Sequence, residues 1–208
     1  MQDIGRNIGI QKERTMGASP RTSDLLKECM ADALLRAMKE KSFEKITVTE
    51  ITEAAGVNRS TWFRNFEGKD EALTFKLVLL WYQWAGEHGM RDCRRYTAEN
   101  VEDFFAFNAS IQPVLETIYH AEQLPCVYDA FCHVMSAKSE TTPAQAYEAR
   151  FYSYGLFGLL DEWIGRGFCE TPQQLAEMLR EMMPASTQQT LMIEIASTRK
   201  TGGSGCGL

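Results

Sequence analysis

Residues 46–73 read ITVTEITEAAGVNRSTWFRNFEGKDEAL, and their local signals point to the architecture of this chain. The stretch opens with a capping box, in which the Thr47 hydroxyl accepts from the backbone of Glu50 while the Glu50 carboxylate reaches back. This box predicts a short helix over residues 48–55. Gly56 ends the helix, because glycine takes the positive φ that many helix ends require. A short capped helix followed by a tight turn is typical of a helix-turn-helix unit.

A further helix is predicted directly after this turn, over residues 59–66, with Asn58 suited to its N-cap. Trp62 and Phe66 lie one turn apart on the same face, which is therefore expected to be buried. The other face is polar and consists of Arg59, Ser60, Thr61, Arg64 and Asn65. A second helix with one apolar and one polar face has the geometry of a helix that enters the major groove of DNA.

The side chains on the polar face are of the types that contact DNA. Arg59 and Arg64 can donate to guanine O6 and N7 or to phosphate, and Phe63 can meet a thymine methyl. Further contacts to bases or backbone are expected from Ser60, Thr61 and Asn65, and contacts to phosphate from Thr47, Thr49 and Lys69. The pattern alone leaves a second interpretation open, in which a small helical unit simply has a solvated polar face.

The same stretch resembles the helix-turn-helix signature of the TetR/AcrR family of bacterial transcriptional regulators. The match in order and spacing covers the Thr-rich start, Ala55-Gly56-Val57, Thr61-Trp62-Phe63, Phe66 and Lys69. This resemblance implies a DNA-binding function. Its DNA-facing positions fall on Thr47, Thr49, Asn58, Arg59, Ser60, Thr61, Phe63, Arg64, Asn65 and Lys69.

Three residues depart from the family pattern. Phe63 stands where the family usually has tyrosine, Asn65 where histidine is common, and Trp62 where a smaller apolar residue is usual. The missing tyrosine hydroxyl removes one phosphate contact, so we expect altered or weaker clamping of the DNA backbone without loss of binding.

The rest of the chain is predicted to be helical as well. Apolar residues recur at three- and four-residue spacing over residues 23–41, and again in a long helix that starts at Lys69 and ends near Gly89. Five more helices are expected at residues 99–110, 112–121, 125–136, 143–165 and 172–183. Pro113, Pro125, Pro143 and Pro172 lie near the starts of these helices, where a missing N–H is tolerated. No alternating strand pattern is present, so the predicted fold class is all-α.

The pattern divides the chain into an N-terminal arm, 1–20, a helix-turn-helix head, 21–70, a helical regulatory and dimerisation domain, 71–184, and a tail, 185–208. The arm and the tail are expected to be flexible. Charge follows the division: residues 1–70 carry 12 basic and 11 acidic side chains, whereas residues 71–208 carry 10 and 17. A near-neutral head on an acidic body is compatible with DNA contact through the head.

The C-terminal segment, residues 151–183, resembles the last two helices of one C-terminal class in the same family. In that class these helices pair with their copies in a dimeric four-helix bundle. The resemblance thus implies a homodimer formed through residues 143–183. Gly155 and Gly158 would let helices approach closely, and the apolar residues around them exceed what one helix side needs.

The resemblance also implies that a small-molecule effector enters the C-terminal domain. The sequence offers an aromatic lining for such a site, in which each residue taken alone is more often ordinary core. The candidates are Trp81, Trp84, Phe104, Phe107, Tyr119, Tyr128, Phe131, Tyr147, Phe151 and Tyr154.

Composition excludes several other classes of protein. The chain has 208 residues, of which 44% are hydrophobic and 24% charged, so it can form a folded core. Its longest apolar run, residues 77–82, is far shorter than the roughly 20 residues that cross a bilayer. The N-terminus lacks the features of a secretory signal, so a cytoplasmic location is expected. The six scattered cysteines are expected to be free thiols.

Metal and enzyme functions are not supported by residue spacing. His120, Cys126, Cys132 and His133 cluster within fourteen positions, but their spacing matches no familiar metal site. The chain also lacks GxSxG, P-loop and GxGxxG motifs. No cofactor, metal or catalytic residue is therefore predicted.

Two functions remain. The first is a TetR-like regulator, more often a repressor than an activator by family precedent, that leaves a pseudo-palindromic double-stranded DNA operator when an effector binds. The alternative is a dimeric effector-binding or protein-interaction module that keeps the fold without reading DNA, which Phe63, Asn65 and the near-neutral head favour.

Overall fold

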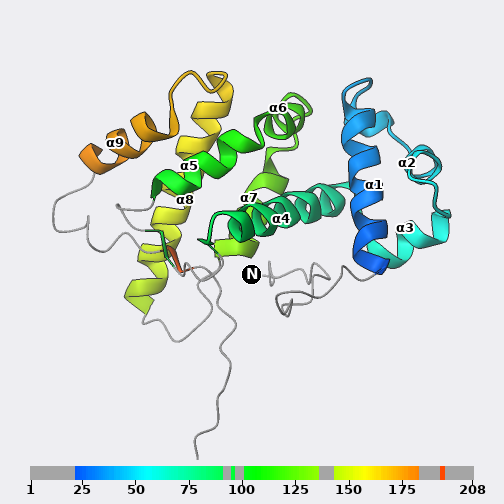
Figure 1. Ribbon diagram of the computed structural model, residues 1–208, viewed down its shortest axis with the longest axis horizontal. Coiled ribbons are helices and arrows are strands. Elements are labelled where there is room, and N and C mark those ends of the chain that lie inside the picture. Colours follow the sequence, from blue (N-terminus) through cyan, green and yellow to red (C-terminus); the bar gives the residue numbers. More distant parts are fainter. Residues whose placement is uncertain (1–21, 91–94, 97–100, 136–142, 183–192, 195–208) are drawn as a thin grey trace, which may run out of the picture.

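Helices make up nearly all the regular structure in the computed structural model, which describes residues 22–90, 95–96, 101–135, 143–182 and 193–194 (Figure 1). The helices are α1 Thr22–Met38, the 3-10 turn η1 Phe43–Lys45, α2 Val48–Ala54, α3 Arg59–Asn65, α4 Lys69–Glu87, α5 Val101–Ser110, α6 Gln112–His120, α7 Leu124–Met135, α8 Pro143–Gly165 and α9 Pro172–Met182. The all-α prediction is confirmed, and the predicted helix boundaries agree to within three residues.

One small sheet was not predicted. The two-residue strands β1, Arg95–Tyr96, and β2, Ile193–Glu194, pair antiparallel, with Arg95 opposite Glu194 and Tyr96 opposite Ile193. Strands this short carry no alternating pattern, because only two positions define them. The predicted arm, residues 1–20, lies outside the described residues. The predicted tail, residues 185–208, does so as well, apart from β2.

The turn between α2 and α3 forms as its residues predict. The Glu50 backbone N–H donates to Thr47 Oγ1 at 3.3 Å, and the Thr47 backbone N–H donates to Glu50 Oε2 at 2.8 Å, which completes the capping box. Gly56 has a φ of 67°. The N–H of Val57 reaches the carbonyl of Thr52 at 2.9 Å, so the end of α2 is a Schellman motif.

The head is held together by aromatic packing beneath α3. Trp62 is 1% exposed and its ring lies 5.1 Å from that of Phe66, centroid to centroid. Phe66 in turn meets Phe75 of α4 edge-on at 5.8 Å. Because Phe75 belongs to α4, the core of the head continues directly into the body of the molecule.

An ion-pair cluster also joins the head to α4. The Lys76 ammonium lies 3.0 Å from a carboxylate oxygen of Glu28 and 2.8 Å from one of Asp32, both on α1. Burial opposes the charge on Lys76, but hydrogen bonds to the two carboxylates outweigh it and raise the pKa of the lysine. Lys76 is buried whereas both carboxylates are partly exposed, so loss of either carboxylate would leave the lysine charge poorly compensated, and this cluster constrains how α1 sits on α4.

The body is a helical bundle around the far half of α4. Figure 1 shows α1–α3 at one end of the molecule, α8 and α9 at the other, and α4 running between them. Helix α4 packs on α1 and α7, α5 packs on α9, and α8 packs on α6 and α7. None of the helices in the described ranges is long and apolar enough to span a membrane.

Candidate nucleic-acid interface and ligand cavity

The outer face of α3 presents polar and aromatic side chains to solvent. Inward packing of Trp62 and Phe66 turns the opposite side of the helix outward, where Asn58, Arg59, Ser60, Phe63 and Arg64 are all exposed. Phe63 is 61% exposed, so most of its ring is open to contact with a partner.

Arg59 and Arg64 provide the positive charge of this face. The Arg59 guanidinium carbon lies 5.9 Å from the centroid of the Phe63 ring, so the two side chains share one side of the helix. In the described part of the chain neither arginine forms an ion pair. Both guanidinium groups therefore keep their donors available for an external acceptor.

Asn58 occupies the N-cap position of α3 as expected, but not in the expected way. Its backbone is extended, with φ −77° and ψ 149°, yet its side chain makes no capping hydrogen bond. The prediction of a side-chain cap is therefore not met, and the exposed amide is left on the same surface as Arg59.

Asn65 forms hydrogen bonds to other residues of the head. Its Oδ1 accepts from the Ser23 hydroxyl of α1 at 3.1 Å, and its Nδ2 donates to the carbonyl of Thr61 at 2.7 Å. Asn65 is half-buried; its Oδ1 links α3 to α1, and its Nδ2 bonds within α3. Sequence reasoning placed this residue on the DNA-facing side and missed the Ser23 contact, which joins positions 42 residues apart.

Lys69 also forms hydrogen bonds to other residues of the head. Its ammonium donates to the carbonyl of Ile46 at 2.9 Å and to that of Phe43, and it lies 4.4 Å from the centroid of the Phe43 ring. Burial lowers the pKa of Lys69, although the nearby Glu44 carboxylate opposes this. Two of the three N–H donors thus fasten the start of α4 to η1, and one remains.

Thr47 and Thr49 lie at the start of α2. Thr47 is exposed, and its hydroxyl bonds Glu50, whereas Thr49 is half-buried. Glu50 also pairs with the Lys41 ammonium. Hydrogen bonds from Lys41 and from the Thr47 backbone and hydroxyl lower the pKa of Glu50 from 4.5 to about 2.

This lowered pKa predicts a pH-dependent contribution to stability. Because Glu50 binds its proton more weakly in the folded state, its stabilisation is complete above about pH 4.5 and is lost as the pH falls toward 2. We expect the midpoint of thermal unfolding of the wild type to exceed that of Glu50→Gln above pH 4.5, and the difference to shrink toward zero near pH 2. Thermal melts of both proteins at a series of pH values measure this. A constant difference across the series would contradict the assignment.

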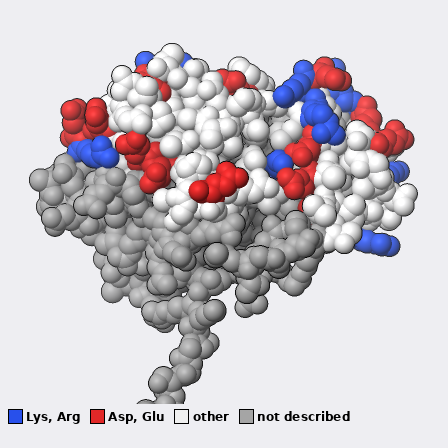
Figure 2. Space-filling model, in the orientation of Figure 1, with Lys and Arg blue, Asp and Glu red and all other residues white. Residues whose placement is uncertain are grey.

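The charged groups of the head do not form a region of one sign. Figure 2 shows Lys and Arg interspersed with Asp and Glu over the part of the surface formed by α1–α3. Attraction of a polyanion would therefore depend more on Arg59 and Arg64 of α3 than on the net charge of the head.

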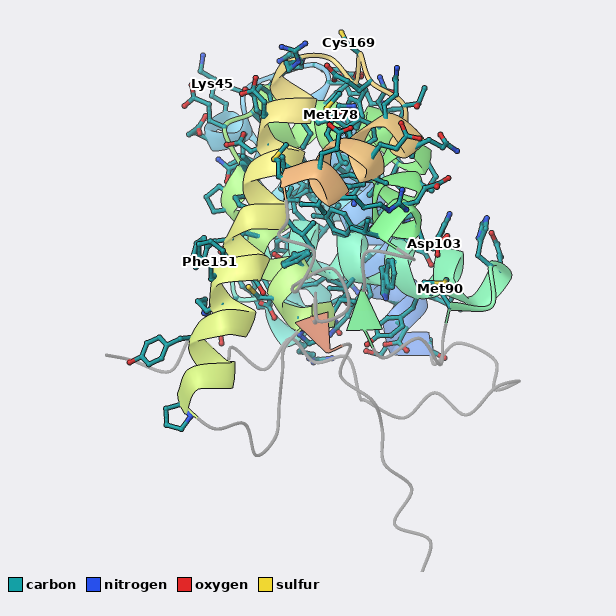
Figure 3. The ribbon with its side chains drawn as sticks, turned by 90° about the vertical axis from the view of Figure 1, so that its left-hand side faces the viewer. Lys45, Met90, Asp103, Phe151, Cys169 and Met178 are labelled. Atoms are coloured by element: carbon teal, nitrogen blue, oxygen red, sulfur yellow. The ribbon has the colours of Figure 1, made fainter. Side chains whose placement is uncertain are left out.

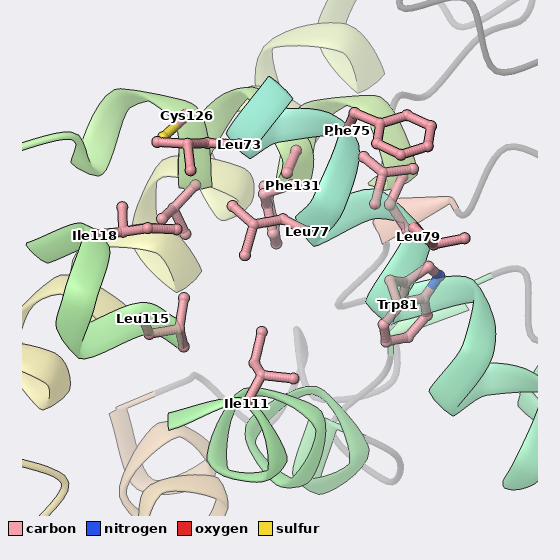
Figure 4. Packing of buried hydrophobic residues seen from close by; sticks show 14 of the residues in the cluster. Leu73, Phe75, Leu77, Leu79, Trp81, Ile111, Leu115, Ile118, Cys126 and Phe131 are labelled. Carbon is pink, nitrogen blue, oxygen red and sulfur yellow. The ribbon is translucent and has the colours of Figure 1, made fainter. Parts of the chain in front are cut away.

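A cavity lies in the body between α4, α5, α6, α7 and α8. It encloses a volume of about 40 Å³. Leu77 of α4, Leu115 of α6 and Ile111, just before α6, point toward this space (Figure 4). Its lining residues are Leu77, Trp81, Phe104, Phe107, Asn108, Ile111, Leu115, Val127, Ala130, Phe131, Val134 and Leu160.

Four of the ten aromatic candidates line this cavity, namely Trp81, Phe104, Phe107 and Phe131. The other six do not. Trp84 stacks on Trp81 and His88 instead, and Tyr119 and Tyr128 lie outside the lining. Sequence reasoning missed Asn108, whose signal was a polar residue one turn after Phe104 and so on the same apolar face of the helix.

The remaining aromatic candidates lie on the surface of α8. Tyr147, Phe151 and Tyr154 are 80%, 74% and 55% exposed. They are spaced three and four residues apart, so they follow one side of the helix. Met178 and Met182 of α9 are exposed as well, and Phe151 and Met178 lie on the end of the molecule opposite the head (Figure 3). We call these five residues the α8–α9 apolar surface.

The cysteine and histidine cluster does not assemble into a site. Cys126 is buried, donates to the Gln123 carbonyl at 2.6 Å, and has its pKa raised to about 12 by burial. Within the ranges that the structure covers, no three His, Cys, Asp or Glu side chains come together as metal ligands. The thiols of Cys29, Cys126, Cys132 and Cys169 are free, as predicted, and Cys93 and Cys206 lie outside the described residues.

Comparison with known proteins agrees with this architecture. Residues 31–73 match the model of bacterial regulatory proteins of the tetR family, and residues 88–185 match a transcriptional regulator C-terminal region of the same family. No curated protein matches the chain. The solved structure of the dihydroxyacetone kinase operon activator DhaS is similar at 14% identity and a TM-score of 0.45, covering 76% of this chain and 93% of that one. The two family matches show that this chain belongs to the TetR family and is a transcription regulator, not an enzyme.

Proposed function

We propose that the protein is a homodimeric repressor that binds a pseudo-palindromic operator through α3 and is released by a small molecule bound in the cavity. One observation carries the first half of this proposal. The outer face of α3 holds two arginines that form no ion pair with any residue the structure describes, and a 61% exposed phenylalanine, over a packed inner face. A rigid helix with such a surface fits the major groove.

The residues of the head divide into two roles under this proposal. Arg59 and Arg64 donate to guanine or phosphate, and Phe63 packs against a thymine methyl or a deoxyribose. Asn58, Ser60, Thr61, Thr47 and Thr49 supply further polar contacts to bases and phosphates. Asn65 and Lys69 are positioning residues, since their bonds hold α3 on α1 and η1 on α4, and the third N–H of Lys69 can still meet a phosphate.

Helix α4 is the element that can transmit ligand binding to the head. Near its start Lys69, Phe75 and Lys76 contact η1, the aromatic core of the head and α1. Leu77, the residue after Lys76, and Trp81, just over one turn further along, form part of the cavity wall. A ligand that favours a different position of α4 would change the spacing of the two heads of a dimer. The loss of operator-binding free energy cannot exceed the difference between the ligand's binding free energies for the DNA-binding and the released conformation.

The α8–α9 apolar surface is the proposed dimer interface. Exposed aromatic residues that follow one side of a helix are typical of surfaces that pack on a second copy. A two-fold axis beside α8 would leave both heads free, because α1–α3 lie at the opposite end of the molecule (Figure 1). Two reading helices one helical turn of DNA apart then account for a pseudo-palindromic site.

We expect Phe151→Glu to convert the dimer into a monomer. Phe151 is 74% exposed in the single chain, so the substitution costs little in the monomer, whereas it places a carboxylate in the proposed interface. Sedimentation equilibrium of the two proteins measures the change. Tyr82→Glu, at an exposed aromatic residue of α4, serves as the control and should leave the dimer intact. A dimer of unchanged stability in Phe151→Glu would place the interface elsewhere.

The test of DNA reading is selection of bound duplexes from a random pool, followed by fluorescence anisotropy on the selected sequence at two salt concentrations. We expect a symmetric consensus and an affinity that falls steeply with salt, because each phosphate contact releases counterions. Equal, weak binding to all duplexes would instead favour a head that contacts protein partners, for which the near-neutral charge of the head is the supporting observation.

A further inference from the structure

Two buried lysines, Lys27 and Lys76, join α1 to α4, and neither is among the residues assigned above to DNA contact. We propose that Lys76 and its two carboxylate partners on α1 are positioning residues that fix the direction of each head on α4. In this way they decide which separation between half-sites a dimer accepts. This role rests on the proposed function, in which a homodimer binds a pseudo-palindromic operator. It gives residues outside α3 a part in operator specificity.

Lys76 is held between two successive turns of α1. Its ammonium lies 3.0 Å from Glu28 Oε1 and 2.8 Å from Asp32 Oδ1, and these two acidic residues are four positions apart on one side of α1. A bond to one carboxylate alone would let α1 turn about the point of contact. Bonds to two successive turns define a line along α1, so they fix the direction of α1 relative to α4.

A second lysine makes the reciprocal contact from α1. The Lys27 ammonium lies 5.4 Å from the ring centroid of Phe75 in α4 and 5.7 Å from that of Phe66 at the end of α3. A cation over an aromatic ring is attracted by the electron density of the ring face, and the attraction is larger when water is excluded. Lys76 thus reaches from α4 to α1, and Lys27 reaches from α1 to α4 and α3, so the junction is braced in both directions.

The same turn of α4 is also fixed to the body. Thr74 is buried, and its hydroxyl lies 3.4 Å from the carbonyl oxygen of Cys126 in α7. Residues 74–76 thus contact α7, the aromatic core of the head and α1 in succession. Because α4 is one continuous helix that runs from α1 toward α8 (Figure 1), the direction set at this turn fixes the head relative to the rest of the protomer.

A small rotation at this junction would change the position of α3. Helices α2 and α3 pack on α1 and lie beyond it as seen from α4 (Figure 1), so α1 carries them when it turns. One additional base pair moves two half-sites apart by about 3.4 Å and rotates one by about 35° relative to the other. Each head of a dimer would have to shift by about 2 Å to follow. A head held rigidly on α4 cannot adapt in this way, whereas a loosely held head can.

Loosening the junction should affect half-sites and full operators differently. The contacts of α3 with one half-site arise within one head, so the affinity for a single half-site should not change. A full operator requires both heads to be in register, and ordering two loosely held heads costs entropy. The correctly spaced operator should therefore bind more weakly, and incorrectly spaced operators should be penalised less. A lysine that only stabilises the fold would instead change all these affinities together.

The variant Lys76→Met tests this role. Methionine has an unbranched apolar side chain that suits a buried position, and the carboxylates it leaves behind are partly exposed and can be hydrated. Anisotropy titrations of full-length protein use the selected operator, the same operator with one base pair inserted or removed between the half-sites, and a duplex with one half-site. We expect the spacing changes to weaken the wild type by about tenfold and Lys76→Met by about threefold, with equal affinities of the two proteins for the single half-site.

Lys39→Met is the matched control, because it removes the same charge from an exposed position just after α1. It should keep the spacing preference of the wild type. The double variant Glu28→Gln with Asp32→Asn weakens the same junction from α1, at partly exposed positions, and should relax the preference in the same direction if Lys76→Met does not fold. A folded junction variant with the spacing preference of the wild type would overturn the proposal, and so would an equal loss of affinity on all four duplexes.

Failure of the proposed function is recognised from the wild type alone. If the wild type binds the single half-site as tightly as the full operator, or binds all spacings equally, dimeric operator binding is contradicted and the role of Lys76 with it. If the wild type prefers one spacing and the folded junction variants keep that preference, the proposed function stands and only the positioning role is contradicted.

Discussion

Replacing Arg59 and Arg64 together by alanine is expected to lower the affinity for the selected operator by about 30-fold or more. Both guanidinium groups are exposed on α3 and neither is held by an ion pair within the described residues, so each can contact DNA. Loss of one arginine that reads a base costs about 1–3 kcal/mol, and loss of a phosphate contact reduces the salt slope by about one. Two arginines therefore account for about 2 kcal/mol or more.

The control for this experiment is Arg36→Ala with Lys39→Ala. These substitutions remove the same two positive charges from the head, at exposed positions near the C-terminal end of α1. Anisotropy titrations at two salt concentrations compare the two double variants with the wild type. If the control variant loses as much affinity and salt dependence as the α3 variant, attraction by overall charge, and not α3, explains binding.

Replacing Trp62 by alanine is expected to destabilise the protein by about 3–5 kcal/mol, the range measured for truncation of large buried aromatic residues. Trp62 is 1% exposed and packs on Phe66, which packs on Phe75 of α4. The cavity left by the indole would lie between the reading helix and the rest of the head. Denaturant unfolding followed by circular dichroism measures the free energy of unfolding, and operator binding should fall together with it.

The adjacent residue provides a matched comparison. Phe63 is 61% exposed, so Phe63→Ala is expected to change the free energy of unfolding by no more than about 0.5 kcal/mol. The same substitution should weaken operator binding, because it removes apolar area from the contact face. The two substitutions would thus separate the effect on stability, at Trp62, from the effect on DNA binding, at Phe63. Equal destabilisation by the two substitutions would contradict the orientation of α3.

The sequence resolved the helices well because their boundaries depend on local chemistry. The capping box of Thr47 and Glu50 and the positive φ of Gly56 involve residues within a few positions of one another. The same holds for the prolines that stand near helix starts. The spacing of Trp62 and Phe66 was enough to decide which side of α3 is buried. Family resemblance then placed ten residues on or near that helix, and five of them are exposed on its outer face or at its N-cap.

The tertiary structure decided the roles that depend on distant partners. Asn65 bonds Ser23, 42 residues away, and Lys69 bonds the carbonyl of Phe43, 26 residues away, so neither partner is visible in a local pattern. The aromatic candidates of the body show the same division. Helical spacing marked Trp81 and Phe151 alike as apolar, but only packing of five helices placed Trp81 in the cavity wall and left Phe151 on the surface.

Local signals in the sequence thus determined the all-α class, the helix boundaries and the buried face of α3. These properties follow from backbone hydrogen bonds and periodicity over one or two turns. The cavity and the α8–α9 apolar surface emerged only in three dimensions. They are differences in burial among chemically similar side chains, and burial is set by which helices pack together, a property that no single segment of the chain contains.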